Sequence, residues 1–139
     1  MSFNTGQNKE IVIRFNKECI EKGIPESFDE LLSDNVVNHS VREGMPNGKE
    51  SFYFFIINVL RHGFSNLKVD ILSQISEGDL VASRKKITAT HTGEIFGIAP
   101  SHKQVEINII DIIRLQDGQY VEHWGQSNFE EVLKQISEK

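Results

Sequence analysis

The sequence contains a single cysteine, Cys19, among its 139 residues. An internal disulfide is therefore excluded, and a reducing compartment is expected. No apolar run approaches the roughly 20 residues that a membrane-spanning helix needs, and the longest, residues 52–60, is interrupted by Asn58. The first ten residues are polar and lack the apolar region of an export signal. These features predict a cytoplasmic protein without a membrane partner.

Motifs for metals, phosphates and nucleic acids are also missing. The five histidines form neither a His-Glu-x-x-His motif nor a short His-x-His pair, so no metal site is expected. The segment "GEIFGIAP" has two glycines but opens no helix, which argues against a phosphate loop. A net charge of −5 disfavours nucleic acid and anionic membranes, because both attract basic surfaces. Neither a metal nor an organic cofactor is predicted.

What the chain does contain is a run of helices, then strands, then one helix. Hydrophobic spacing predicts helices over residues 7–22, 25–33 and 49–62, and strands over 67–75, 80–93, 104–115 and 120–127, followed by a helix from Asn128. Gly78 and Gly118 suit the tight turns between neighbouring strands. This order is typical of the α+β class, with helices on one face of a curved antiparallel sheet. We expect a single domain over residues 1–139.

Several segments carry a family resemblance. They are "NHS" (38–40), "THTGEIFGIAPSHKQV" (90–105) and "IDIIRLQDGQYVEHWG" (110–125), and the opening "NKEIVIRFNKECIEKG" also fits. Together they resemble the SnoaL-like polyketide cyclases of the nuclear-transport-factor-2-like superfamily. The resemblance implies a cone-shaped α+β barrel with an apolar pocket, and a homodimer packed sheet to sheet. It also implies an intramolecular aldol cyclisation without cofactor, in which an aspartate directly after a His-Trp pair serves as acid or base. Here Gly125 stands at that position.

Asp111 is the candidate that can replace the missing acid. It lies in the most apolar strand, on a face with Ile109 and Ile113. A carboxyl group in such surroundings is expected to have a raised pKa, which suits a general base near neutrality. The alternative is a structural role, in which Asp111 binds Arg84, Lys86 or a backbone amide.

His123 is the second catalytic candidate. It shares a strand face with Gly125, and a hairpin centred on Asp117 and Gly118 brings it beside Asp111. An Asp-His pair could relay a proton or orient a ligand. The alternative is a structural histidine packed beside Trp124.

Four further residues are candidate ligand contacts. His39 follows the second helix near the expected mouth of the cavity, and Phe55 belongs to the predicted apolar stripe of the third helix. Trp124 suits either a pocket wall or a dimer interface, and it points away from His123 if the strand alternates. Arg84, alternating with Lys86, could give the pocket a cationic lining, although such charges usually lie on a solvated strand face.

Three functions remain open at this point. The first is a cofactor-free cyclase- or isomerase-like enzyme that acts by proton transfer on an apolar or polycyclic carbonyl compound. The second is a ligand-binding domain that has lost the acid, as Gly125 suggests. The third is a dimeric interaction domain that uses its sheet and Trp124.

Overall fold

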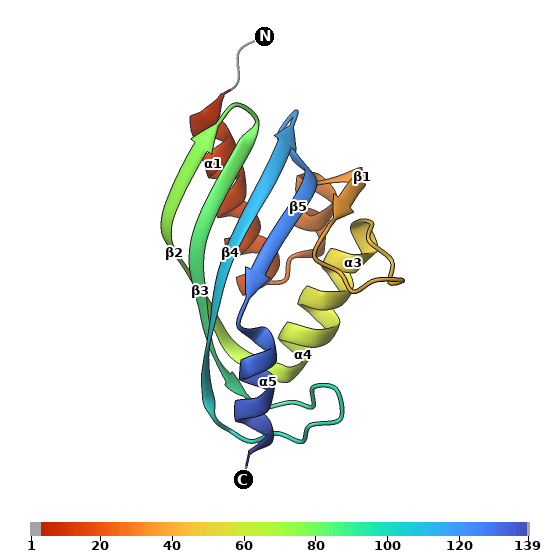
Figure 1. Cartoon of the computed structure of the whole chain (residues 1–139), viewed down its shortest axis with the longest axis vertical. Coiled ribbons are helices and arrows are strands. Elements are labelled where there is room, and N and C mark those ends of the chain that lie inside the picture. The colour runs from red at the N-terminus through yellow and green to blue at the C-terminus, as the bar shows by residue number, and fades with distance from the viewer. Residues whose placement is uncertain (1–3, 139) are drawn as a thin grey trace.

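The protein is built on a curved, open sheet of five strands in the order β1-β5-β4-β3-β2 (Figure 1). The computed structural model describes residues 4–138. The last four strands form an antiparallel meander, whereas β1 pairs with β5 in parallel. The strands are β1 (Leu32–Asn38), β2 (Phe64–Glu77), β3 (Leu80–His91), β4 (Gln104–Gln116) and β5 (Gln119–Ser127).

Helices cover the concave face of this sheet. The first is α1 (Thr5–Arg14), which continues into the π-helical segment η1 (Phe15–Glu21) and packs against β2. Figure 1 shows α1 behind the sheet and α3 beside its β1 edge. The remaining helical segments are α2 (Pro25–Leu31), α3 (Lys49–Tyr53), η2 (Phe54–Leu60), α4 (Arg61–Gly63) and α5 (Phe129–Ser137). The α+β class is confirmed: a curved sheet wraps around the N-terminal helices, and a helix follows it.

Strand alternation decides what the sheet turns toward the helices. On β3 every second residue from Val81 to His91 is buried, which is the period of two expected for a strand with one covered face. Most of the inward residues are apolar, and Val12 and Phe15 of the first helix complete the core. Lys85 and His91 are buried on the same face, so the interior includes polar groups.

The turn between β4 and β5 sets the register of the site. Asp117 and Gly118 both have positive φ angles, of 52° and 78°, as the predicted Asp-Gly hairpin turn requires. A register shift follows between Arg114 and Leu115. Beyond it, Asp111 lies directly opposite Gly125.

The third helical segment differs from its prediction. Residues 49–62 are helical, but residues 54–60 are π-helical rather than α-helical. The other residues of the predicted stripe, Phe52, Ile56, Val59 and Leu60, are buried as expected. Phe55, expected with them, is 39% exposed and packs edge-on against Phe129.

Candidate active site

Three polar side chains from neighbouring strands meet on the concave face of the sheet, which the helices cover. Lys85, Asp111 and His123 come from β3, β4 and β5, and the alternation of each strand turns them toward the helices. The side chains of Lys85 and Asp111 are each only 5% exposed, and that of His123 is 18% exposed. We call these three residues the inner polar cluster. The predicted neighbourhood of Asp111 and His123 is confirmed by this register.

The Asp111 carboxylate is held in an ion pair. Lys85 Nζ lies 3.2 Å from Asp111 Oδ2, and His123 Nε2 lies 3.5 Å from the same oxygen. Burial alone would raise the pKa of Asp111, but the charge of Lys85 and the bond with His123 together lower it below its ordinary value. The raised pKa expected from the sequence is therefore wrong. The cation that pairs with Asp111 is Lys85. It lies in the sequence between Arg84 and Lys86, the two partners suggested from the sequence.

The second carboxylate oxygen is a buried acceptor. Asp111 Oδ1 is enclosed and has no hydrogen-bond partner among residues 4–138. Such a group is costly to leave unpaired, because it loses its hydration without gaining another donor. Asp111 Oδ1 can therefore accept a hydrogen bond from a hydroxyl group or a water molecule.

Asn38 determines which ring nitrogen of His123 carries the proton when the ring is neutral. Asn38 Oδ1 accepts a hydrogen bond from the backbone N–H of Ser40 at 3.0 Å, which identifies that atom as the amide oxygen. The same oxygen lies 3.0 Å from His123 Nδ1, so Nδ1 must donate to it. In the neutral ring the lone pair then resides on Nε2, the nitrogen that faces Asp111. Nε2 is thus the atom of His123 that can take up a proton.

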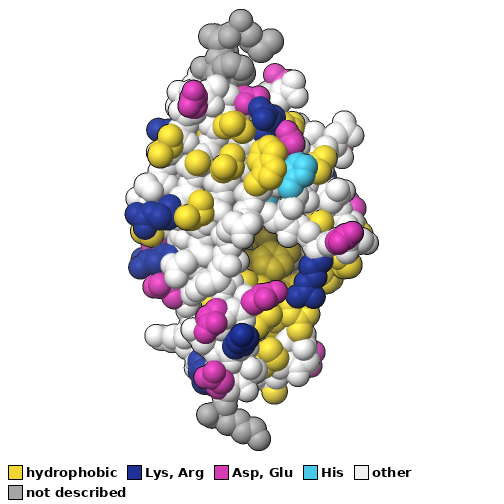
Figure 2. All heavy atoms as spheres, viewed as in Figure 1, with side chains coloured by type: hydrophobic (Ala, Val, Ile, Leu, Met, Phe, Trp, Pro, Cys, Tyr) yellow, Lys and Arg dark blue, Asp and Glu magenta, His cyan; other side chains and the backbone are white. Residues whose placement is uncertain are grey.

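Gly125 packs closely against this nitrogen. A Cβ atom at position 125 would lie 3.3 Å from His123 Nε2 and 3.5 Å from Asp111 Cβ. It would also lie 3.0 Å from His123 Cε1, so the ring would have to give way by a few tenths of an ångström. Glycine at this position therefore lets the His123 ring lie directly against the backbone of β5. The C-terminal half of β5 borders a hollow in the surface, with hydrophobic side chains at its floor (Figure 2).

The segment after the second helix lies alongside the His-Trp-Gly segment, residue by residue. Asn38 contacts His123, the His39 ring stacks on Trp124 at 4.9 Å between centroids, and Ser40 Oγ accepts the Gly125 N–H at 2.6 Å. The parallel pairing of β1 with β5 produces this match. It holds His123 from the side opposite to β4.

Trp124, His39 and Arg84 lie outside the inner polar cluster. Trp124 points to the convex face, as strand alternation predicted, and His39 joins it there through a 2.9 Å contact between His39 Nε2 and Glu122. Arg84 is exposed on the same side of the sheet, next to Ile110. These three candidate ligand contacts therefore belong to a different surface from the catalytic candidates.

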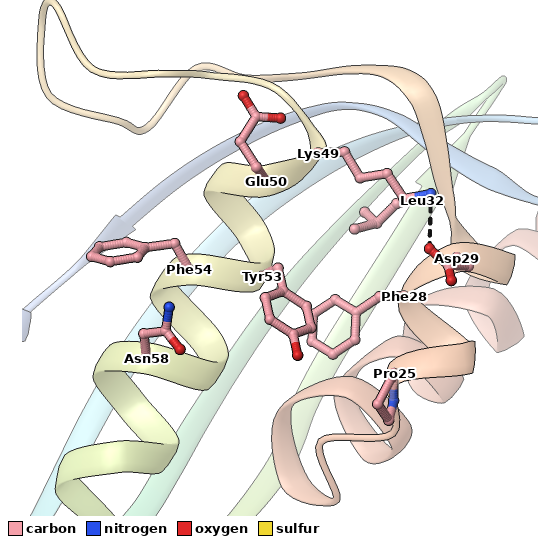
Figure 3. A pocket seen from close by; sticks show the side chains of 9 residues that line it. All are labelled: Pro25, Phe28, Asp29, Leu32, Lys49, Glu50, Tyr53, Phe54 and Asn58. Atoms are coloured by element: carbon pink, nitrogen blue, oxygen red, sulfur yellow. Dashed lines mark ion pairs between the residues drawn. The ribbon is translucent and has the colours of Figure 1, made fainter.

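A groove between α2 and α3–η2 is a separate feature (Figure 3). It has a volume of about 550 Å³. Phe28 and Tyr53 meet edge-to-face in it at 5.2 Å, and Lys49 lies at one end in an ion pair of 3.3 Å with Asp29. No member of the inner polar cluster lines this groove, and Phe55 does not line it either.

Sequence reasoning missed Lys85 and its partner Asn16. The sequence did contain a signal for Lys85. It lies four residues from both Val81 and Ala89, so strand alternation places it on the same core-facing side as these two residues. Among the described residues, no group of three or more His, Cys, Asp or Glu side chains could hold a metal ion. No helix in residues 4–138 has the length and hydrophobicity to cross a membrane.

Comparison with known proteins identifies the fold and the family. The family model for the SnoaL-like polyketide cyclase matches residues 10–136. A putative SnoaL-like polyketide cyclase from Jannaschia sp. CCS1 is 26% identical, with a TM-score of 0.84 over 100% of this chain and 97% of that one. IdmH, a putative polyketide cyclase from Streptomyces antibioticus, is 25% identical, with a TM-score of 0.76 over 95% and 99%.

A third solved structure shares the fold under a different name. AclR, a putative hydroxylase from Streptomyces galilaeus, is 22% identical, with a TM-score of 0.82 over 96% of this chain and 82% of that one. No functionally curated protein matches the chain. The fold is thus common to structures named for two kinds of reaction, so the residues of the site have to decide the chemistry.

Proposed function

Because the chain belongs to the SnoaL-like polyketide cyclase family, we propose that it is a cofactor-free enzyme that transfers protons on an apolar carbonyl compound. The reaction is of the cyclase or isomerase type. The observation that carries this proposal is the contact of 3.5 Å between His123 Nε2 and the buried Asp111 carboxylate, next to Gly125, where a side chain would crowd the imidazole.

His123 acts as the base in this proposal. Its side chain is more exposed than that of Asp111, at 18% against 5%, and its Nε2 carries the lone pair because Nδ1 donates to Asn38. Nε2 takes a proton from the carbon next to a carbonyl group, and the C–H electron pair moves into the enolate. The negative charge of Asp111 stabilises the imidazolium that forms. In a cyclisation the enolate carbon then bonds to a second carbonyl carbon, and His123 returns the proton to the new alkoxide.

Asp111 therefore has a different role from the one expected at first. Its lowered pKa makes it a weak base near neutrality, but keeps it negatively charged beside the histidine. Its second oxygen, Oδ1, is enclosed and out of direct reach of the substrate, so Asp111 acts through His123.

Proton abstraction can be tested before the substrate is identified. A panel of apolar mono- and polycyclic ketones is incubated in D₂O, and deuterium uptake next to the carbonyl is measured by mass spectrometry. His123→Gln should lower the exchange rate at least roughly 100-fold. His102→Gln, in an exposed loop, is the matched control and should keep the wild-type rate. Unchanged exchange in His123→Gln would refute the assignment of the base.

The groove between α2 and α3–η2 favours a second candidate, a non-catalytic ligand-binding module. Its aromatic walls and its volume suit a small apolar ligand. An apolar fluorescent dye should bind the wild-type protein and bind more weakly to Tyr53→Ala. Dye binding that responds to Tyr53→Ala, together with no deuterium exchange in any ketone, would support the module over the enzyme.

We also propose that a second copy of the chain covers the convex face of the sheet. Large apolar side chains are exposed there on β2 and β4, including Ile75 at 72% and Ile110 at 58%. Trp124 extends this apolar surface onto β5. Sedimentation velocity should show a dimer for the wild type and a monomer for Ile110→Lys. A monomer at all concentrations in the wild type would refute the proposal.

A further inference from the structure

Lys85 is a charged side chain enclosed within the fold. Its ammonium nitrogen lies 2.6 Å from Asn16 Oδ1 and 3.2 Å from Asp111 Oδ2. Lys85 points toward the helices, whereas its neighbours Arg84 and Lys86 are on the convex side. Lysine is almost never fully buried unless it is paired.

Asn16 determines where the ammonium group sits. Asn16 is itself buried, and its Nδ2 donates to the Val12 carbonyl oxygen at 2.8 Å. That bond leaves Oδ1 as the atom directed at Lys85. The first helical turn of η1 therefore supplies a fixed acceptor for a cation on β3.

Stability alone gives little reason for such an arrangement. Desolvating two charges costs about as much as their attraction returns, and apolar residues of similar size would serve the core at least as well. The pair does, however, lie against the proposed base: Asp111 Oδ2 contacts both Lys85 Nζ and His123 Nε2.

We propose that Lys85, held in place by Asn16, is a positioning residue that keeps Asp111 ionised and so allows His123 Nε2 to accept and release a proton. This inference rests on the proposed function of His123. It adds a role for the Lys85 ammonium group, which does not touch the substrate. Lys85 keeps Asp111, the residue next to the base His123, negatively charged.

Other ionisable groups near Asp111 do not replace Lys85. Among the described residues, the charges that act on Asp111 are those of Lys85 and His123. Tyr120 and Cys19 are also buried nearby, and burial raises the pKa of both, that of Cys19 to about 12, so they stay neutral. Without Lys85, the buried Asp111 carboxylate would take up a proton more readily, and the imidazolium formed on His123 would lose its counter-ion.

The experiment measures the two titrations directly. The ¹³Cγ shift of Asp111 and the Cε1–H shift of His123 are followed by NMR across the pH range in the wild type, Lys85→Met and Lys86→Met. Lys86 is the matched control, because it is the next residue after Lys85, lies on the convex side of the sheet and pairs with Glu106 at 3.8 Å. In Lys85→Met the Asp111 midpoint should move to higher pH by about one unit or more, or the Asp111 and His123 signals should titrate together. Lys86→Met should titrate like the wild type.

Two outcomes would overturn the proposal: an Asp111 titration in Lys85→Met that matches the wild type, or an equal change in Lys86→Met. If Lys85→Met does not fold, Lys85→Gln removes the charge while keeping a polar group for Asn16, and the same comparison applies. Because these titrations need no substrate, they stand or fall separately from the deuterium-exchange test of His123. Where exchange is detected, the pH–rate profile of the Lys85 variant should also be displaced, which a purely structural role would not cause.

Discussion

Asp111 and Gly125 lie directly opposite each other on β4 and β5, with their Cα positions paired across the hairpin. The position after His-Trp, where the family resemblance implied an acid, thus faces, in this chain, a carboxylate on the neighbouring strand. The negative charge is kept within the same small region of the sheet. It is held there by Lys85 rather than presented on β5.

Adding a single side-chain carbon at position 125 should slow proton transfer. In Gly125→Ala the new Cβ would meet the His123 ring, so the ring must move and proton transfer should fall by roughly 10-fold or more. The unfolding free energy should change by no more than about 1–3 kcal/mol, the range for overpacking. Exchange kinetics and urea denaturation measure the two effects.

Gln126→Ala provides the control on the adjacent, exposed position of β5. It should leave both the exchange rate and the unfolding free energy near wild-type values. Full exchange activity in Gly125→Ala would show that proton transfer does not depend on how the His123 ring lies against β5.

The buried ion pair should behave as a unit in stability measurements. Lys85→Met alone leaves the Asp111 carboxylate buried without its main counter-charge, and should cost roughly 3–5 kcal/mol at neutral pH. The double variant Lys85→Met/Asp111→Leu removes both charges and should recover most of that loss. Urea unfolding of the two single variants and the double variant gives the coupling energy. Additive losses would mean that the two charges do not interact.

Acid stability should depend on Glu18. Hydrogen bonds from Arg14 and from Ser27 lower the pKa of Glu18 from 4.5 to about 2. Since the folded-state pKa lies below the unfolded value, the stabilisation is present above about pH 4.5 and is lost as the pH falls toward about 2. Arg14→Met should therefore cost roughly 1 kcal/mol at pH 6 and less at pH 2, as measured by thermal or urea unfolding.

Lys17→Met is the control for this pair, because Lys17 also bonds a glutamate four residues along the same helix but is more exposed. Its effect should be smaller at both pH values. An Arg14→Met cost that does not change with pH would contradict the role of Glu18.

Tyr120 should remain protonated through the pH range in which an exposed tyrosine ionises. Burial and the charge of Asp111 raise the pKa of Tyr120 well above 10. Phenolate absorbance of the folded wild type and of Tyr120→Phe should therefore coincide around pH 10. Because the raised pKa belongs to the folded state, the wild type should lose stability as the pH rises above 10, and Tyr120→Phe should lose less. A phenolate signal that disappears in Tyr120→Phe below the unfolding pH would contradict this.

The elements that the sequence predicted well are those governed by local chemistry. Alternating strands and the Asp-Gly turn at residues 117–118 were enough to place Asp111 beside His123. The four strands of the meander match the predicted ranges to within three residues at each end, because alternating hydrophobicity and turn residues can be read from the sequence, whereas β1 was not among the predicted strands.

The predictions that were wrong concern features set by residues elsewhere in the chain. The pKa of Asp111 is set by Lys85 on another strand, and the position of Lys85 depends on Asn16, which is 69 residues away. Apolar neighbours alone predicted a raised pKa for Asp111, and no pattern within β4 could reveal the cation on β3 that reaches it diagonally. Phe55 was misplaced for a different reason, since its contact is Phe129 of the last helix, which the spacing within η2 cannot reveal.

The bond between Asn38 and His123 also has a consequence for how the molecule folds. It joins residues 85 positions apart, because β1 pairs with β5, the last strand of the meander. Hairpins between consecutive strands close short loops, whereas this contact carries the entropy cost of a long one. The imidazole should therefore be among the last groups to reach its final orientation during refolding. A population of chains with a finished sheet and an unaligned histidine would be compact, native-like by circular dichroism, and inactive.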